Sequence, residues 1–295
     1  MVTQTVTTTN LHGPGDHVVA DINYLPALGT PIPTYAWKRR YLGVSDEHTR
    51  SMIIQDIRKQ PVQAFDLAAN GFKFIELPPK QRVDSSSTEE TIRETYYPEL
   101  EALAKSLTGA SIAFVFNHVV RAHNSPSDEG VPDKLGRWQG IPTGHPHVDY
   151  CGELTALEGT KEELTFPPHI RSLYDASSRY AYLGAWRPLR TLRRDPLAVC
   201  DATTVPDSDY QVRLREFRSG VKSANYVMSH AKAEQQHQWY YMSEMRDDEI
   251  VVFKGYDTEQ SKPGWRCPHT AIKLPDSDEE PPRESIEARI VCFWE

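Results

Sequence analysis

Proline and glycine interrupt this chain so often that long helices have little room to form. The 295 residues include 22 prolines and 16 glycines, and the segments between them are short. Several segments are rich in the β-branched and aromatic residues that favour strands: 71–77, 110–120, 179–189, 248–257 and 285–294. Many short strands joined by polar loops are typical of an antiparallel barrel or sandwich. The sequence therefore predicts a mainly β fold with flanking helices.

Helical patterns are confined to the first 110 residues. Segment 45–58 begins with Ser45, a candidate N-cap, and places three isoleucines on one helical face, Ile53, Ile54 and Ile57. Segment 87–109 carries apolar residues at helical spacing and ends at Gly109, a typical helix stop. Pro98 interrupts that segment and is acceptable as the first residue of a second helix. We expect these helices to brace one outer face of the β structure.

No internal repeat and no long low-complexity linker divides the chain. We expect residues 1–20, which are polar and threonine-rich, to form a flexible arm. Residues 21–295 are expected to form one domain with helical elements at about 45–110, because this length suits a single elaborated barrel or sandwich.

The net charge and the cysteines indicate which binding partners and which cellular compartment to expect. The net charge is −8, and no run of lysine or arginine follows the pattern of a nucleic-acid-binding surface. The longest apolar runs fall well short of the roughly 18 residues that span a bilayer. The four cysteines form no C-x-x-C pair, and the amino terminus does not resemble a secretory signal. We therefore expect a cytoplasmic protein with reduced thiols, no nucleic-acid partner and no membrane span.

The stretch "GHPHVDY" contains a candidate pair of metal ligands, His147 and Asp149. Residues two apart on a strand project to the same side, so this pair offers an imidazole nitrogen and a carboxylate oxygen to one point. His145 shares that parity, but Pro146 predicts a bend, and we expect His145 to lie nearby without binding metal. A lone H-x-D is more often a surface turn than a ligand pair, and a metal site needs a third ligand.

Three later histidines are candidates for that third ligand. His230 and His237 lie in a polar stretch with little strand character. His269 begins a strand-like segment after a turn marked by proline, and it precedes Arg283 at a workable distance along the chain. We therefore predict His269 as the third ligand.

Two imidazoles and one carboxylate on one face of an octahedron leave three coordination positions open on iron(II). Oxygenases use these open positions to bind a cosubstrate and O2 together. A cosubstrate such as 2-oxoglutarate chelates iron through its keto acid end, and its far carboxylate needs a cation with paired donors. Arg283 and Ser285 project to one side of a strand and offer a guanidinium beside a hydroxyl. Arg289 has the same parity and is the second choice for this clamp.

A series of motifs in the same order resembles one family. After H-x-D come "AWRPL", "DPLAVCD", "HQWYY", "DEIVVFKGYD", "PHTA" and "RESIEAR". This series is similar to the fungal iron(II)/2-oxoglutarate-dependent oxygenases of the gibberellin desaturase-like or cephem methoxylase-like type. The resemblance runs from about residue 60 to the carboxyl end and implies a double-stranded β-helix (jelly-roll, cupin-like) core.

The resemblance also implies the cofactors, the chemistry and the site. It implies Fe(2+), 2-oxoglutarate and O2, with His147, Asp149 and His269 as the triad and Arg283 with Ser285 at the distal carboxylate. Members of the family hydroxylate, desaturate, cyclise or form endoperoxides on small natural-product scaffolds in secondary metabolism. A small hydrophobic substrate is therefore expected here.

Arg187 lies in the tryptophan-arginine-proline segment that the family shares. "LGA" precedes this segment, where relatives tend to have an asparagine-containing run. Arg187 has two interpretations, as a contact to 2-oxoglutarate or substrate and as a stacked, paired side chain at a strand end.

Several other residues are candidates for the pocket. Trp138 lies in the loop 123–143, which is rich in glycine and proline, and is a candidate for covering the substrate. The alternative is a mobile surface loop with an exposed aromatic side chain that shields the barrel mouth. Trp239 and Tyr241 are candidates for gating a hydrophobic substrate, with core packing as the alternative. For Arg121 and Asn117 we expect an ordinary hydrogen-bond network in a strand.

The sequence is also compatible with two other functions. A cupin-type metal isomerase or hydrolase would use the same triad without 2-oxoglutarate and would give Arg283 no role. An auxiliary, non-catalytic subunit would complete the pocket of a partner. Exposed strand edges make a homodimer, or a heterodimer with a paralogue, a reasonable expectation.

Overall fold

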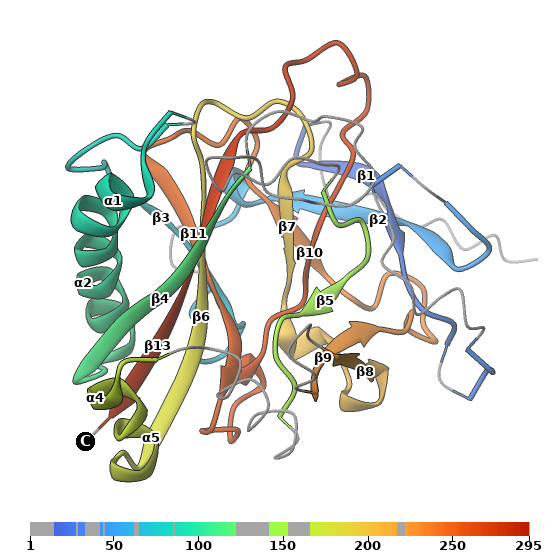
Figure 1. Ribbon diagram of the computed structural model, residues 1–295. Helices are drawn as coiled ribbons and strands as arrows, with labels where there is room; N and C mark the ends of the chain where they lie inside the picture. Colours follow the sequence, from blue (N-terminus) through green and yellow to red (C-terminus); the bar gives the residue numbers. More distant parts are fainter. Residues whose placement is uncertain are drawn as a thin grey trace, which may run out of the picture.

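The computed structural model describes residues 15–294 apart from 28, 33–41, 44, 62–64, 85, 122–141, 153–165 and 217–221. Two curved sheets form the core of this described part (Figure 1). Side chains from both sheets pack together in the space between them, with Phe72 and Trp186 from one sheet against Val199 and Tyr240 from the other. This is the expected double-stranded β-helix, or jelly-roll, arrangement.

The five-stranded sheet contains all the strongest predicted strands. In spatial order it consists of β3 (Phe72–Glu76), β11 (Glu249–Asp257), β6 (Arg179–Pro188), β13 (Ser285–Trp294) and β4 (Ile112–Arg121). All neighbouring strands are antiparallel. Every residue of β11 is buried, which explains why its apolar residues form a nearly continuous run. The predicted strands in these five segments are confirmed.

The eight-stranded sheet is built from shorter strands. Its spatial order is β1 (His17–Asn23), β2 (Thr49–Asp56), β10 (Trp239–Tyr241), β7 (Leu197–Cys200), β12 (His269–Ala271), β5 (His147–Val148), β9 (Lys222–Met228) and β8 (Tyr210–Glu216). Only the pairing of β10 with β2 is parallel among the strand pairs of the described residues.

The predicted helix 87–109 is confirmed, with a change of geometry before its proline. It consists of α1 (Glu89–Thr91), a π-helical turn η3 (Ile92–Tyr96) and α2 (Tyr97–Thr108). The Thr88 hydroxyl accepts a hydrogen bond from the Thr91 amide, and Gly109 ends α2 with a φ of 71°. Leu100 and Ala104 pack against Ala288 of β13, so α2 covers the outer face of the five-stranded sheet (Figure 1).

The remaining helical segments are short. They are α4 (Pro168–Arg171), α5 (Leu173–Ala176) and the 3-10 turns η2 (Ile57–Lys59), η4 (Ala202–Thr204), η5 (Asp207–Asp209) and η6 (Pro263–Trp265). No helix in the described ranges is long and apolar enough to cross a membrane.

The predicted helix 45–58 is wrong, because most of this segment forms strand β2. Met52, Ile54 and Asp56 are buried while Ile53 is 38% exposed, an alternation with period two. β2 lies between β1 and β10, and pairing on both sides outweighs the helical spacing of its isoleucines.

The predicted flexible arm 1–20 is wrong for its last four residues, which form part of a strand. Residues 1–14 lie outside the described part of the chain. His17 to Ala20 belong to β1, where Val18 pairs with Ile54 and Ala20 pairs with Met52 across the neighbouring strand. These residues are therefore part of the sheet.

Candidate metal centre and cosubstrate pocket

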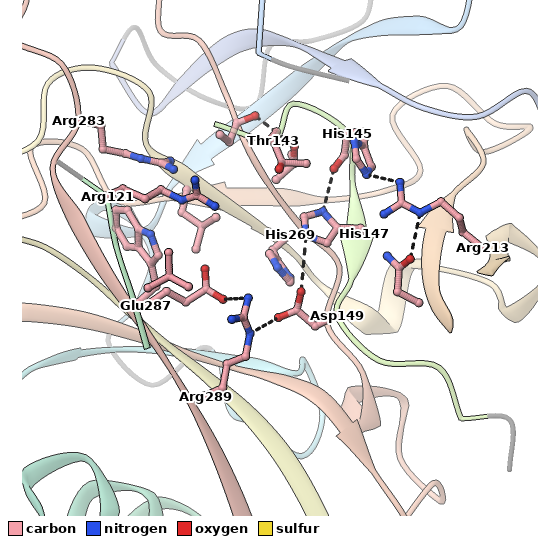
Figure 2. Close-up of a pocket in the computed structure, with 16 residues that line it drawn as sticks. Arg121, Thr143, His145, His147, Asp149, Arg213, His269, Arg283, Glu287 and Arg289 are labelled. Atoms are coloured by element: carbon pink, nitrogen blue, oxygen red, sulfur yellow. Dashed lines mark hydrogen bonds and ion pairs between the residues drawn. The ribbon is translucent and has the colours of Figure 1, made fainter. Parts of the chain in front are cut away.

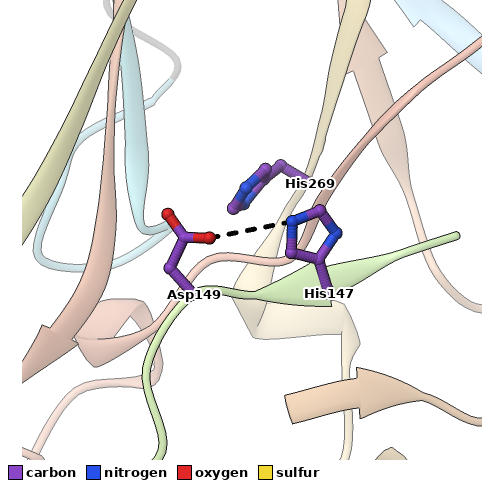
Figure 3. A group of neighbouring side chains, drawn as sticks. All are labelled: His147, Asp149 and His269. Atoms are coloured by element: carbon purple, nitrogen blue, oxygen red, sulfur yellow. Dashed lines mark ion pairs between the residues drawn. The ribbon is translucent and has the colours of Figure 1, made fainter. Parts of the chain in front are cut away.

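The structure brings together the three residues predicted as metal ligands, although they come from distant parts of the sequence. β5 and β12 are neighbouring antiparallel strands, and His269 lies directly opposite His147 in their register. Asp149 follows β5 and points to the same side (Figure 3). One ligand atom from each residue lies within 4.8 Å of the other two. The distance from His147 Nε2 to Asp149 Oδ1 is 3.7 Å.

Both histidines of this group are oriented by backbone carbonyls two residues earlier. His147 Nδ1 donates to the carbonyl of His145 at 3.0 Å, and His269 Nδ1 donates to the carbonyl of Cys267 at 3.2 Å. With Nδ1 protonated, each ring presents the lone pair of Nε2 to an ion. Burial, together with the neighbouring His269, lowers the pKa of His147 to about 3. The His147 ring is therefore neutral and able to bind a metal ion at physiological pH.

The group lies in the wall of a cavity of about 430 Å³ between the two sheets (Figure 2). The charged residues that line the cavity are Arg121, Arg213, Arg283, Arg289, Asp149 and Glu287. Arginines therefore outnumber carboxylates among the described lining residues, and the cavity favours an anionic ligand.

Arg283 and Arg121 lie at one end of the cavity (Figure 2). Arg283 Nη1 donates to the carbonyl of Asp195 at 2.9 Å, while its buried Nε has no hydrogen-bond partner among the residues that the structure describes. Burial and the neighbouring Arg121 cation lower the pKa of Arg283 to about 9. An unsatisfied donor and two adjacent guanidinium groups fit a carboxylate, which would supply both the missing acceptor and the missing negative charge. Ser285 is buried beside them but does not line the cavity, and its predicted contact stays a prediction.

Arg289 has different neighbours from Arg283. Its Nε lies 3.5 Å from Asp149 Oδ2, and its Nη2 lies 3.2 Å from Glu287 Oε1. Burial opposes its charge, but the Glu287 and Asp149 carboxylates outweigh burial and raise the pKa of Arg289. The guanidinium is thus held between two acids of this chain, which favours Arg283 over Arg289 as the clamp for a ligand.

Arg187 does not reach the cavity, which corrects its assignment to the cosubstrate. It alternates with Trp186 on β6, and the two side chains point to opposite faces of the sheet. Arg187 Nη2 donates to the carbonyl of Leu77 at 2.8 Å and lies 3.4 Å from Glu99 Oε1 of α2. The interpretation as a paired structural side chain is the one that the structure supports.

Replacing Arg187 by alanine is expected to lower the free energy of unfolding by about 3 kcal/mol, because it leaves the Glu99 carboxylate buried without its cation. The affinity for 2-oxoglutarate should not change. Chemical denaturation and a binding titration of the folded protein measure the two quantities separately. Arg190→Ala, at a more exposed arginine of the neighbouring turn, is the control and should change stability by less than about 0.5 kcal/mol.

The residues "LGA" precede Trp186, where relatives tend to have an asparagine-containing run, and side-chain packing explains the glycine among them. Gly184 lies beneath the ring of Phe253 on the adjacent strand, and a Cβ at this position would overlap that ring. The Phe253 ring in turn lies 4.4 Å from the ring of His269, measured between centroids. Gly184 therefore leaves room for the aromatic side chain that supports one of the predicted ligands.

Of the three predicted substrate residues, the two that the structure describes, Trp239 and Tyr241, do not line the cavity. Trp138 lies outside the described residues. Trp239 is fully buried and donates from Nε1 to the Tyr24 hydroxyl at 2.8 Å. Tyr241 belongs to the same apolar cluster of the eight-stranded sheet. For Trp239 and Tyr241, the alternative of core packing is correct.

Sequence reasoning underestimated or missed several residues of the cavity. Arg121 was expected in an ordinary hydrogen-bond network, but it lines the cavity beside Arg283. Glu287 lies an even number of positions from both Arg283 and Arg289, so a strand places all three side chains on the same side. This relation could be read from the sequence. Arg213 and Asn225 carry no such signal, since a polar residue facing the inside of a barrel alternates in the same way as one facing solvent.

The fold and the donor set define a class of protein. Two histidines and one carboxylate at the mouth of a double-stranded β-helix are the ligand set of non-haem iron(II) oxygenases, which leave coordination positions open for cosubstrate and O2.

Comparison with known proteins gives the family. A family model described as "Oxidoreductase/YMDC permease-like domain" matches residues 25–293. The chain is 33% identical to hydroxylase/desaturase efuI of Hormonema carpetanum, over 84% of this chain and 85% of the relative. It is 30% identical to the alpha-ketoglutarate-dependent dioxygenase phiK of a fungal species, over 83% and 84% of the two chains.

Similarity to a solved structure supports the same family. The iron and alpha-ketoglutarate-dependent endoperoxidase NvfI superposes with a TM-score of 0.65 at 27% identity, covering 95% of this chain and 97% of that one. The chain belongs to this family of fungal iron(II)/2-oxoglutarate-dependent oxygenases, and it is an oxidoreductase that uses Fe(2+), 2-oxoglutarate and O2.

Proposed function

We propose that His147, Asp149 and His269 hold a single ferrous ion, and that Arg283 holds the far carboxylate of 2-oxoglutarate. The observation that carries this proposal is the convergence of three ligand atoms within 4.8 Å in the wall of a cavity that also contains Arg283. The unsatisfied Nε of Arg283 supports the second half of the proposal. The cosubstrate then lies between the metal ligands and this arginine.

When bound, iron and 2-oxoglutarate supply the oxidising power of the reaction, and the protein positions the reactants. The carbonyls of His145 and Cys267 hold the two imidazoles in the tautomer that binds metal. Arg121 and Arg283 form a fixed cationic end that orients the cosubstrate along the cavity.

Anaerobic titration with iron(II) and then with 2-oxoglutarate tests this proposal. We expect one iron per chain and, after addition of 2-oxoglutarate, a weak visible charge-transfer band. Protein that holds iron but develops no such band would favour the cupin-type isomerase or hydrolase. Protein that forms the band but consumes no 2-oxoglutarate unless a paralogue is added would favour the auxiliary subunit.

Arg289 is expected to act through Asp149. Because its Nε lies 3.5 Å from Asp149 Oδ2, it can hold that oxygen away from the ion and leave Oδ1 as the ligand. Replacing Arg289 by glutamine should weaken iron(II) binding by about 10–100-fold, the usual effect of losing a partner of a metal ligand. Iron titration measures this change. An Arg289→Gln variant that binds iron normally but 2-oxoglutarate poorly would move the clamp to Arg289.

The substrate is proposed to be a small natural-product scaffold of fungal secondary metabolism. Relatives with the names hydroxylase/desaturase, GA4 desaturase and endoperoxidase support hydroxylation, desaturation or endoperoxide formation as outcomes of this site. Cyclisation is a further outcome that we propose from the family resemblance. Which outcome follows depends on how the reacting carbon is held relative to the metal ligands.

We also propose a single domain that works in the cytoplasm as a dimer. Packing of both sheets around common clusters supports one domain. The four cysteines are buried and free, which supports a reducing compartment. β1 and β8 are the two edges of the larger sheet and are the surfaces at which strands of a second chain would pair.

A further inference from the structure

A stack of aromatic rings begins one residue after the predicted metal ligand Asp149. Tyr150 follows Asp149 in the chain, and its ring lies over Gly255 of β11 and against the ring of Tyr182 on β6. The Tyr150 and Tyr182 rings are stacked, with 4.5 Å between their centroids and 26° between their planes. The group that is expected to hold iron is therefore next to rings that can be oxidised.

The stack continues from Tyr182 to the surface of the molecule. The hydroxyl groups of Tyr182 and Tyr174 are 2.9 Å apart and share a hydrogen bond. The ring of Tyr180 lies 5.0 Å from that of Tyr174 and 5.9 Å from that of Tyr182, measured between centroids. Tyr182 is fully buried, whereas Tyr180, near the start of β6, and Tyr174, on α5 (Figure 1), are half-buried. These residues form the tyrosine path, which consists of Tyr150, Tyr182, Tyr174 and Tyr180.

Packing alone does not explain the hydroxyl groups of the tyrosine path. Several other rings of the same cluster fill space without a polar group: Phe114, Phe116, Phe166 and Phe293. Burial raises the pKa of Tyr182 well above its usual value, so its phenol stays protonated, and a buried hydroxyl costs free energy unless it is hydrogen-bonded. A phenol loses an electron far more readily than a benzene ring, provided that a neighbour accepts its proton. The hydrogen bond between Tyr182 and Tyr174 supplies such a neighbour.

We propose that the tyrosine path carries oxidising equivalents from the metal centre to the surface, as a second function beside substrate oxidation. The inference rests on the proposed metal centre. When iron, 2-oxoglutarate and O2 react before a substrate is in place, no substrate carbon receives the oxidising equivalents, and the protein itself is the remaining target. The tyrosine path gives these equivalents an exit that spares the metal ligands.

Electrons and protons balance in this process. Conversion of 2-oxoglutarate and O2 to succinate and carbon dioxide leaves one oxygen atom, which two electrons and two protons reduce to water. Each electron passes from Tyr150 to the metal centre and is replaced from Tyr182, and then from a tyrosine at the surface. The surface tyrosine loses its proton to solvent and becomes a neutral radical. A one-electron reductant in solution, such as ascorbate, restores it with one electron and one proton.

The test uses protein that is loaded anaerobically with iron(II) and 2-oxoglutarate and is then exposed to O2 without substrate. Freeze-quenched samples are expected to show a tyrosyl radical by electron paramagnetic resonance, with a signal that narrows when the protein contains ring-deuterated tyrosine. Ascorbate should remove this signal and increase the amount of 2-oxoglutarate consumed before the protein is inactivated. Absence of a tyrosyl radical, or a radical that ascorbate does not reduce, would overturn the inference.

Variants assign the radical to the tyrosine path. Tyr182→Phe keeps the ring and removes the group that is oxidised. It is expected to lose most of the radical signal, to be inactivated several-fold faster and to gain no protection from ascorbate. Tyr150→Phe should behave in the same way, and it serves if Tyr182→Phe does not fold. The control Tyr241→Phe removes a hydroxyl from the apolar cluster of the eight-stranded sheet and should match the wild type.

A radical signal of wild-type intensity in both Tyr182→Phe and Tyr150→Phe would contradict the assignment, because it would show that these two rings only pack in the core. Failure of the proposed function looks different. In that case the wild-type protein does not form the complex with iron and 2-oxoglutarate, and its visible band is missing before O2 is added.

Discussion

Replacing Asp149 by alanine is expected to weaken iron(II) binding by more than about 100-fold and to abolish turnover of 2-oxoglutarate. The change removes the only anionic member of the His147, Asp149 and His269 group, and it leaves two neutral imidazoles that compete poorly with water for the ion. The effect should exceed the 10–100-fold loss that is typical for residues behind a metal ligand. Iron titration under anaerobic conditions measures it directly.

The matched control for this variant is Asp175→Ala, at an exposed aspartate of α5. It removes the same charge far from the cavity lining and should leave iron binding unchanged. If Asp149→Ala retained wild-type affinity for iron(II), the ion would be bound elsewhere and the proposed centre would be wrong.

Replacing Arg283 by glutamine is expected to leave iron binding intact and to weaken 2-oxoglutarate binding by about 10–100-fold. The expected loss corresponds to a charge-assisted, paired hydrogen bond of about 1.5–3 kcal/mol. Glutamine keeps a donor near the carbonyl of Asp195 while removing the cation. Titration of the iron-loaded variant with 2-oxoglutarate gives the dissociation constant.

Related variants identify the clamp if Arg283 is not the residue. Arg121→Gln should weaken 2-oxoglutarate binding less than Arg283→Gln, because Arg121 is the neighbour that completes the cationic end. Normal affinity in Arg283→Gln together with a large loss in Arg121→Gln would reverse these roles. Loss in neither variant would indicate that the far carboxylate binds outside this end of the cavity.

The sequence allowed reliable prediction of the five-stranded sheet but less of the eight-stranded one. Strands such as β11 and β13 are long and mostly buried, so their apolar runs are clear signals. β5 and β12, which carry two of the predicted ligands, have only two and three residues, too few for any periodic pattern. Their side chains were found through chemistry, from the H-x-D spacing and a later histidine.

The errors at the site have a common physical cause. The side to which a strand residue points follows from parity, but which face of the sheet meets a helix depends on the packing of distant segments. From the sequence, Arg187 had two interpretations, and the contact to 2-oxoglutarate or substrate is not the one found, because α2 covers its face of the sheet. Arg213 was missed because nothing in the sequence indicates that its face of β8 points into a cavity.

Crystals soaked anaerobically with iron(II) and 2-oxoglutarate, with anomalous data collected at the iron edge, test the central claim most directly. A single peak is expected within reach of His147 Nε2, His269 Nε2 and one oxygen of Asp149. The far carboxylate of 2-oxoglutarate should pair with Arg283. An anomalous peak at any other position, or one that lacks any of these three ligands, would contradict the account.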